Sequence, residues 1–284
     1  MGQGFDAIAA NRAPQAPRLL DQDVITACAS PDVICIQEIL SRDAQVFFDV
    51  LGEHGLSSSF RDHNKMSLQP VSMRGSGLGI GSRRALAKTS LSRFDGPSVG
   101  WDRLARKGTL YTQIKLDADL ELDVLNVHLQ AGYDAGAIAV RARQLVAVRA
   151  LISAFAAAER PFIVCGDFNI DGLSEVRANE EYGRLEAALE GFVDVGAPED
   201  LPTFHPHPEG NTLAHWFEPD GPAQRVDYVF FRRAIGPAAR FQYRRLARFF
   251  DSPLTRTPKI KARNGEGTHA FASDHYGLTA TFEH

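Results

Sequence analysis

The feature that most constrains the fold is a series of short apolar runs that recur along the chain. Their lengths and their branched and aromatic side chains are typical of buried β-strands. The runs are FDAIAA (5–10), DVICIQ (32–37), GLGIGS (77–82), TLYTQIKL (109–116), LDVLNVH (122–128), FIVCG (162–166), VDYVFF (226–231) and GLTATF (277–282).

Segments with helical spacing lie between these runs. The clearest covers about 136–158, where Ile138, Leu145, Val148, Ile152 and Phe155 can form one apolar stripe. Weaker helical patterns cover 18–29 and 42–51, and the Pro-, Gly-, His- and Asn-rich segment 196–224 is predicted to be a long surface loop. Strands and helices intermixed over one long chain predict an α/β protein in which helices cover the faces of sheets.

Composition narrows the class of protein further. Hydrophobic residues make up 44% of the chain and charged residues 23%, which is ordinary for a soluble globular enzyme with a sizeable core. Because no repeat or Pro/Gly/Ser linker divides the chain, we predict a single domain over residues 1–284. No run is long enough to cross a bilayer and no signal peptide is visible. We therefore expect a cytoplasmic protein, or an exported one whose leader was removed.

The net charge of −4 hides an uneven distribution. Between Arg232 and Arg263 lie ten Lys or Arg residues and one acidic residue, Asp251. Of the totals of 31 basic and 35 acidic residues, 21 and 34 remain outside this segment, a balance of −13. The basic segment 232–263 is either a solvated face or a patch for an anionic surface, which would be phospholipid or nucleic acid.

Polar side chains gather at the ends of the predicted strands. Carboxylates and amides are costly to bury without partners. When several such groups lie at the ends of core strands, binding a hard cation together lowers the free-energy cost of burying them. Oxygen ligands of this kind suit Mg²⁺ or Mn²⁺. The residues are Asn11, Gln37, Glu38, Asn126, His128, Asp167 and Asn169 at strand ends, with Asp227, Asp274 and His275 near later strand starts.

The stretch FIVCGDFN (162–169) illustrates why no single motif decides the function. Asp167 and Asn169 follow a buried strand, where both residue types also form turns by capping their own backbone. A turn and a functional site are both compatible with these residues alone. The order and spacing of the other motifs must therefore distinguish the two.

Five motifs occur in a characteristic order, namely IQE (36–38), NVHL (126–129), GDFN (166–169), RVDYVFF (225–231) and SDH (273–275). In this order they resemble the endonuclease/exonuclease/phosphatase superfamily, whose members cleave phosphate esters with a divalent metal. The resemblance runs from about Asn11 to Leu278. It implies a four-layer α/β sandwich in which two mixed β-sheets pack face to face between helices. It also implies Mg²⁺ as cofactor, with Mn²⁺ as the other suitable ion.

Further motifs resemble one branch of that superfamily, the neutral sphingomyelinases. WDRLARKGTL (101–110) is similar to their Asp-x₄-Lys-Gly element, with Asp102 and Lys107 at its two ends. NVHLQAGYDAG (126–136) and EGNT (209–212) also look like that branch. Lys107 and Gly108 are equally compatible with the ordinary start of a strand.

The resemblance implies a metal site and a substrate site. Glu38 would bind the metal directly, Asn11 would help to place the ion or the phosphate, and Asp274 would touch the metal directly or through water. Asn11 is also compatible with a simple turn before Pro14. Asn126 is either part of the substrate network or a core amide, and the core amide is slightly favoured. Four residues are predicted on the substrate side: Lys107, Asp102, Asn126 and Tyr133.

Five residues are predicted to carry the chemistry. Asp167 would orient or help to deprotonate the attacking water, and Asn169 would donate to a phosphoryl oxygen. His275 is the expected general base because imidazole titrates nearest neutral pH, with Asp227 fixing its tautomer. His128 would donate to the phosphate or protonate the leaving oxygen, in a reaction dominated by positioning and charge neutralisation.

The resemblance therefore implies a metal-dependent phosphodiesterase that acts on a phospholipid at an anionic membrane surface, with sphingomyelin cut to ceramide and phosphocholine. One alternative is a nuclease of the same superfamily, because the basic segment 232–263 would serve DNA or RNA as well. A phosphatase for small or inositol phosphates is another. A catalytically dead binding module is disfavoured by the full set of catalytic residue types. No obligate protein partner is evident.

Overall fold

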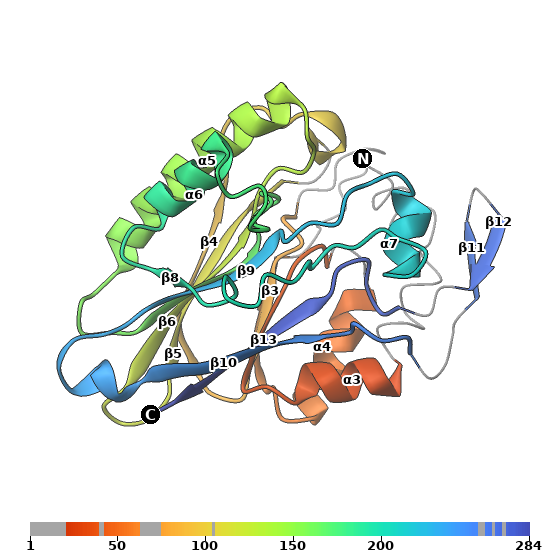
Figure 1. Cartoon of the computed structure of the whole chain (residues 1–284). Helices are drawn as coiled ribbons and strands as arrows, with labels where there is room; N and C mark the ends of the chain where they lie inside the picture. The colour runs from red at the N-terminus through yellow and green to blue at the C-terminus, as the bar shows by residue number, and fades with distance from the viewer. Residues whose placement is uncertain are drawn as a thin grey trace.

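The computed structural model describes residues 21–39, 43–62, 75–103, 106–254, 259–262, 265–268 and 271–284. Its largest sheet has six strands in the order β4-β5-β6-β7-β9-β8 (Figure 1). These strands are β4 (Leu86–Arg93), β5 (Gly108–Lys115), β6 (Glu121–His128), β7 (Phe162–Asp167), β8 (Val193–Asp194) and β9 (Asp227–Arg232).

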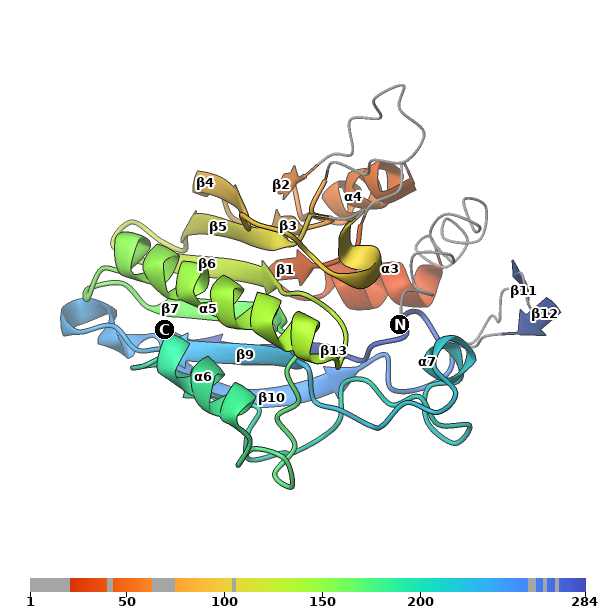
Figure 2. The same ribbon diagram turned by 90° about the horizontal axis from the view of Figure 1, so that it is seen from above.

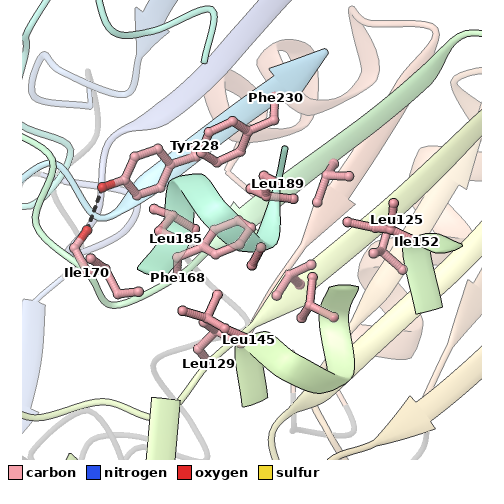
Figure 3. Packing of buried hydrophobic residues seen from close by; sticks show 14 of the residues in the cluster. Leu125, Leu129, Leu145, Ile152, Phe168, Ile170, Leu185, Leu189, Tyr228 and Phe230 are labelled. Carbon is pink, nitrogen blue, oxygen red and sulfur yellow. Dashed lines mark hydrogen bonds between the residues drawn. The ribbon is translucent and has the colours of Figure 1, made fainter. Parts of the chain in front are cut away.

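This sheet is mixed because β6 and β7 run parallel, whereas its other neighbouring strands are antiparallel. Parallel neighbours need a long crossover connection, which α5 (Ala135–Phe155) supplies. Helix α5 and α6 (Glu180–Ala188) cover the outer face of the sheet. Leu145, Val148 and Ile152 of α5 pack there against Leu125 and Phe162 of the strands, in the core shown in part in Figure 3.

The opposite face of the six-stranded sheet packs against a second layer of strands. One part is a three-stranded antiparallel sheet, in the order β1-β3-β2, of β1 (Val33–Ile36), β2 (Ser58–Arg61) and β3 (Gly79–Ser82). The other is the antiparallel pair of β10 (Gln242–Phe249) and β13 (Gly277–Glu283). Ile80, Leu110, Val124 and Phe231 form part of the apolar contact between the layers.

Helices α3 (Gln22–Ala29) and α4 (Asp43–Glu53) cover the outer side of β1 and β3. The order of layers is therefore helices, strands, strands, helices (Figure 1). This architecture confirms the predicted four-layer α/β sandwich. The six-stranded sheet is the mixed one, and the described strands of the second layer pair antiparallel.

Smaller elements complete the described chain. They are the 3₁₀ helices η1 (Gly100–Arg103) and η2 (Gly236–Arg240), helix α7 (Thr212–Phe217), and the strands β11 (Lys259–Ala262) and β12 (Gly265–Thr268). The β11–β12 hairpin projects away from the body in both views (Figures 1 and 2). No helix in the described part of the chain is long and apolar enough to span a membrane.

Seven of the eight predicted strands correspond to observed ones, and the strand predicted at 5–10 lies outside the described residues. The helix predicted at 136–158 is α5. The predicted loop 196–224 contains the short helix α7 and is otherwise irregular. Strands β2, β4 and β10 were not predicted because their side chains are largely part-exposed or exposed, so they lack an apolar run.

The described arginines of the basic segment mostly contact other parts of the protein. Arg240, Arg244 and Arg248 form ion pairs with Asp117, Glu283 and Asp251. The guanidinium of Arg232 lies over the rings of two phenylalanines. These contacts favour the solvated-face interpretation for the part of the segment whose side chains are described.

Candidate active site

Three polar residues are aligned at one edge of the six-stranded sheet by strand register. His128, the last residue of β6, is the register partner of Asp167 at the end of β7. Asp167 is in turn the partner of Asp227, the first residue of β9. Because β9 is antiparallel to β7, the start of one strand meets the end of the other. The sheet therefore brings together residues from three distant motifs.

His275 joins this group through a direct contact with Asp227. Its Nδ1 lies 2.8 Å from Oδ2 of Asp227. Burial acts to lower the pKa of His275, but the negative charges of Asp227, Asp167 and Asp274 prevail and raise it well above the usual value. The backbone at Asp227 is fixed by Thr203, whose Oγ1 accepts hydrogen bonds from the backbone amides of Val226 and Asp227.

The GDFN turn has a geometry that only certain residues tolerate. A Cβ on Gly166 would lie 2.0 Å from the carbonyl oxygen of Val127, so β7 can approach β6 this closely only with glycine there. Asn169 has a φ of 52°, in the left-handed region that Asn adopts more readily than most residues. Its amide donates to Asp167 Oδ2 at 3.1 Å and to the Leu129 carbonyl at 3.0 Å.

The turn interpretation and the site interpretation of FIVCGDFN are therefore compatible. Asp167 accepts a hydrogen bond from the backbone amide of Asn169 at 2.8 Å, as in an ordinary Asx turn. Burial acts to raise the pKa of Asp167, but the hydrogen bond with His128 and the positive charges of His275 and Lys107 lower it overall. The carboxylate consequently stays ionised in the physiological pH range.

A buried lysine lies at the centre of the site. The Nζ of Lys107, which is 4% exposed, lies 2.5 Å from His128 Nε2, 3.6 Å from Glu38 Oε1 and 3.5 Å from Asp102 Oδ1. Burial acts to lower the pKa of Lys107, but the carboxylates of Asp102, Glu38 and Asp167 raise it overall. The same Nε2 of His128 also lies 3.4 Å from Asp167 Oδ2, so the imidazole stands between the ammonium group and a carboxylate.

Glu38 enters the site from the second layer of strands. Its backbone φ is 58°, another left-handed conformation that is uncommon outside glycine. Its side chain is 51% exposed, and Oε1 lies 3.8 Å from Nε2 of His128. Glu38 and His275 also line the wall of the same cavity. His128 and Asp167 connect the two residues, because His128 Nε2 lies 3.4 Å from Asp167 Oδ2 and Asp167 clusters with His275, so the site residues of the first and last motifs converge.

Asn126 lies beneath the site and fastens the two layers together. It is fully buried. Its Oδ1 accepts from Gln37 Nε2 at 2.6 Å, and its Nδ2 donates to the carbonyls of Ile36 and Gly79, both at 3.1 Å. This arrangement favours the interpretation of Asn126 as a core amide over a contact with substrate.

The donors available for a metal ion are mainly carboxylates. In the described part of the chain, Asp167, Asp227 and His275 each place one ligand atom within 4.8 Å of the others. Of the predicted ligands, Glu38 and Asp274 line the same cavity, whereas Asn11 lies outside the described residues. Ionised oxygen donors with one exposed carboxylate suit a hard divalent cation such as Mg²⁺. The residues present therefore fit the ion that the sequence predicts.

Asp102 connects Lys107 with the loop that follows β6. Its Oδ2 accepts from the backbone amide of Ala131 at 2.7 Å, while its Oδ1 faces Lys107. A Cβ on Gly108 would lie 2.5 Å from the carbonyl oxygen of Ser92, so the glycine of the Lys-Gly pair also allows β5 to pair closely with β4. The Asp-x₄-Lys-Gly element thus serves the start of a strand and the polar cluster together.

Two residues that sequence reasoning missed hold the loop after Asn169. Arg225 donates to the Gly172 carbonyl at 3.1 Å through Nε and pairs with Asp194 at 2.7 Å. Tyr228 donates to the Ile170 carbonyl at 2.6 Å, as Figure 3 shows. Both belong to RVDYVFF, where a buried arginine and a tyrosine in an otherwise apolar run were the available signal.

The fold and this site define a metal-dependent phosphoesterase of the α/β-sandwich class. The model of the Endonuclease/Exonuclease/phosphatase family matches residues 6–275. This chain belongs to that family. No curated protein sequence matches it significantly.

Solved structures support the fold at low sequence identity. Sphingomyelinase C from Streptomyces griseocarneus aligns with a TM-score of 0.74 and 18% identity, over 94% of this chain and 92% of that one. A mutant beta toxin from Staphylococcus aureus with bound magnesium ions gives a TM-score of 0.73 at 18% identity, over 96% and 94%. TDP2 from D. rerio, complexed with a single-strand DNA product, gives 0.66 at 18% identity, over 97% and 95%.

Proposed function

We propose that this protein is a Mg²⁺-dependent phosphodiesterase that hydrolyses a phospholipid, with sphingomyelin cut to ceramide and phosphocholine. The observation that carries the proposal is the alignment of His128, Asp167 and Asp227 on adjacent strands, with His275 and Glu38 facing them. The structural similarity to sphingomyelinase C supports the choice of substrate. The Asp-x₄-Lys-Gly element, which contacts the same site, supports it independently.

Glu38 and Asp274 are the residues proposed to hold the metal, with Asn11 as the third predicted participant. A bound divalent cation would neutralise negative charge on a phosphoryl oxygen. Glu38 suits this role because its carboxylate is half-exposed and lies 3.8 Å from His128 Nε2, at the cluster of site residues. Mn²⁺ has a similar preference for oxygen ligands and is expected to substitute.

His275 is proposed to act, in its neutral form, as the general base on the attacking water, with a bound divalent cation offsetting the carboxylate charges that raise its pKa in the metal-free protein. Asp227 accepts the Nδ1 proton of its ring, so Nε2 is the nitrogen that takes the proton from water. Asp167 lies close enough to Asp227 and His275 to orient that water. After the transfer, the imidazolium is stabilised by the negative charge of Asp227.

Lys107, His128 and Asn169 are proposed to act on the phosphate itself. Lys107 brings a buried positive charge next to His128, where charge develops on the phosphoryl oxygens. The Asn169 amide that now donates to Asp167 would instead donate to a substrate oxygen. His128 would donate to the phosphate or to the leaving oxygen once substrate displaces its contact with Lys107.

A substrate panel tests this proposal directly. Sphingomyelin, phosphatidylcholine, lysophospholipids, abasic DNA and inositol phosphates would each be assayed with EDTA and after addition of Mg²⁺. We expect Mg²⁺-dependent release of phosphocholine from sphingomyelin micelles, lost in His275→Ala and kept in His54→Ala, which alters an exposed histidine. Cleavage of DNA with sphingomyelin left intact would instead favour a nuclease.

The nuclease is the second candidate because TDP2 shares the fold and was solved with a DNA product. Against it, the described arginines of the basic segment 232–263 are largely paired within the protein. A nucleic-acid site instead needs cations that are available to phosphates.

A further inference from the structure

The loop between β6 and α5 is held beside the active site by several hydrogen bonds. Arg141 on α5 donates to the carbonyls of Gln130 at 2.9 Å and Gly132 at 2.7 Å. The backbone amide of Gln130 donates to Gln144 Oε1 at 2.8 Å, and Asp102 accepts from Ala131. The loop begins directly after His128 and Leu129, so its geometry is tied to the reacting end of β6.

This loop presents an aromatic ring to solvent. Tyr133 is 45% exposed, and it is the only aromatic residue among the large hydrophobic side chains exposed in the described chain. Its hydroxyl donates to Gln224 Oε1 at 2.8 Å and lies 3.5 Å from Glu218 Oε2. The hydroxyl end is therefore hydrogen-bonded, while the residue as a whole remains accessible to solvent.

Negative charge lies near the hydroxyl end of this side chain, where Glu218 Oε2 is 3.5 Å from the oxygen. Burial of the hydroxyl raises the pKa of Tyr133, and the carboxylates of Glu218, Asp171 and Asp167 raise it further. Gln224, which holds the hydroxyl, immediately precedes Arg225, Val226 and the site residue Asp227. An exposed aromatic ring near several carboxylates and next to a phosphoesterase site is chemically suited to an organic cation.

We propose that Tyr133 and Glu218 form a subsite for the quaternary ammonium group of a phosphocholine headgroup. The inference deepens the proposed function and rests on it for the identity of the substrate. A trimethylammonium group has no N–H to donate, so an aromatic face and carboxylate charge are the means of recognising it. The phosphate of the same headgroup would then lie toward Asn169 and His128.

A purely structural role for Tyr133 is the competing explanation, because its hydroxyl links the β6–α5 loop to Gln224. Two substitutions separate the roles. Tyr133→Phe removes the hydroxyl link but keeps the ring. Tyr133→Leu removes the aromatic face while keeping an apolar side chain. A subsite needs the ring, whereas a structural link needs the hydroxyl.

The test is inhibition of bis(p-nitrophenyl) phosphate hydrolysis by phosphocholine and by methyl phosphate, in the presence of Mg²⁺. We expect wild type and Tyr133→Phe to bind phosphocholine more tightly than methyl phosphate. In Tyr133→Leu the ratio of the two inhibition constants, which measures this preference, should fall by about three- to thirtyfold. In Glu218→Gln it should fall by less. Equal preference in wild type and Tyr133→Leu, or a loss in Tyr133→Phe as large as that in Tyr133→Leu, would overturn the subsite.

This readout separates the subsite from the proposed function. If wild type hydrolyses the nitrophenyl ester but not sphingomyelin, the proposed substrate is wrong whatever the inhibition results are. If it hydrolyses sphingomyelin but Tyr133→Leu keeps the full preference for phosphocholine, the proposed function stands and the subsite does not. Thermal unfolding of each variant checks that the loop has not simply lost its structure.

Discussion

Asp227 and His275 are separated in sequence by the whole basic segment 232–263, yet their side chains meet at 2.8 Å between Oδ2 and Nδ1. The contact joins the start of β9 to the SDH motif that precedes β13. It thereby links the six-stranded sheet to the second layer of strands at the site. The pairing is the arrangement by which a carboxylate orients a catalytic imidazole.

The first prediction concerns this pair. Asp227→Asn should lower kcat by about 10²–10⁴-fold while leaving the fold intact, because the amide no longer favours the required His275 tautomer or stabilises its imidazolium. Steady-state kinetics on sphingomyelin micelles measures the loss. Asp220→Asn, which alters an exposed carboxylate, is the matched control. A wild-type kcat in Asp227→Asn would remove the pair from the mechanism.

The second prediction concerns the dependence of stability on pH without metal. The folded-state pKa of His275 is raised above an unfolded value of about 6.5. Its stabilisation should therefore be complete below that unfolded value and be lost as pH rises through the folded pKa. We expect the stability advantage of wild type over the Asp227→Asn, His275→Asn double variant to shrink with rising pH. Urea unfolding in EDTA measures it, and a constant difference would contradict the expectation.

The third prediction concerns the buried lysine. Lys107→Ala should lower kcat/KM by about 10²-fold, because it removes a positive charge from the site and leaves Asp102, Glu38 and Asp167 without their shared partner. Lys115→Ala, at an exposed position on the same strand, should have no such effect. Wild-type rates in Lys107→Ala would mean that the Lys-Gly pair only starts β5.

The fourth prediction concerns the metal. Activity should disappear in EDTA and return with Mg²⁺. In Glu38→Gln the Mg²⁺ concentration needed for half-maximal activity should rise at least about tenfold, because a neutral amide is a poorer ligand than a carboxylate. Isothermal titration with Mg²⁺ gives a second readout. Glu53→Gln, another exposed glutamate, is the control, and an unchanged Mg²⁺ requirement in Glu38→Gln would count against Glu38 as a ligand.

The fifth prediction separates the two interpretations of Asn126. Asn126→Ala should destabilise the protein by about 2–4 kcal/mol, because a fully buried amide loses three hydrogen bonds between the layers. Removing the surface helix cap Asn179 in Asn179→Ala should cost only about 1 kcal/mol. Denaturant unfolding gives both values. A stable Asn126→Ala variant with a raised KM would restore the substrate-binding interpretation.

Much of the sandwich was predictable because its central strands are continuous apolar runs. The segments 122–128, 162–166 and 226–231 became three neighbouring strands of the six-stranded sheet. Strands β4 and β10 were not predictable in the same way. Exposed polar positions such as Lys88 and Arg244 interrupt their apolar pattern, and their pairing depends on partners far along the chain.

The candidate site was likewise predictable in part from local sequence and in part only from contacts between distant segments. By itself, the sequence determined which residue types stand at the strand ends and the order of the motifs that carry them. It also determined the glycine that lets β7 approach β6. Only the tertiary structure decided that the Asn126 side chain points into the contact between the two strand layers. It also placed Lys107 at the centre of the charge cluster and left Tyr133 exposed. Local periodicity reports which side chains are apolar, whereas contacts between distant segments depend on strand order and register, which no local pattern encodes.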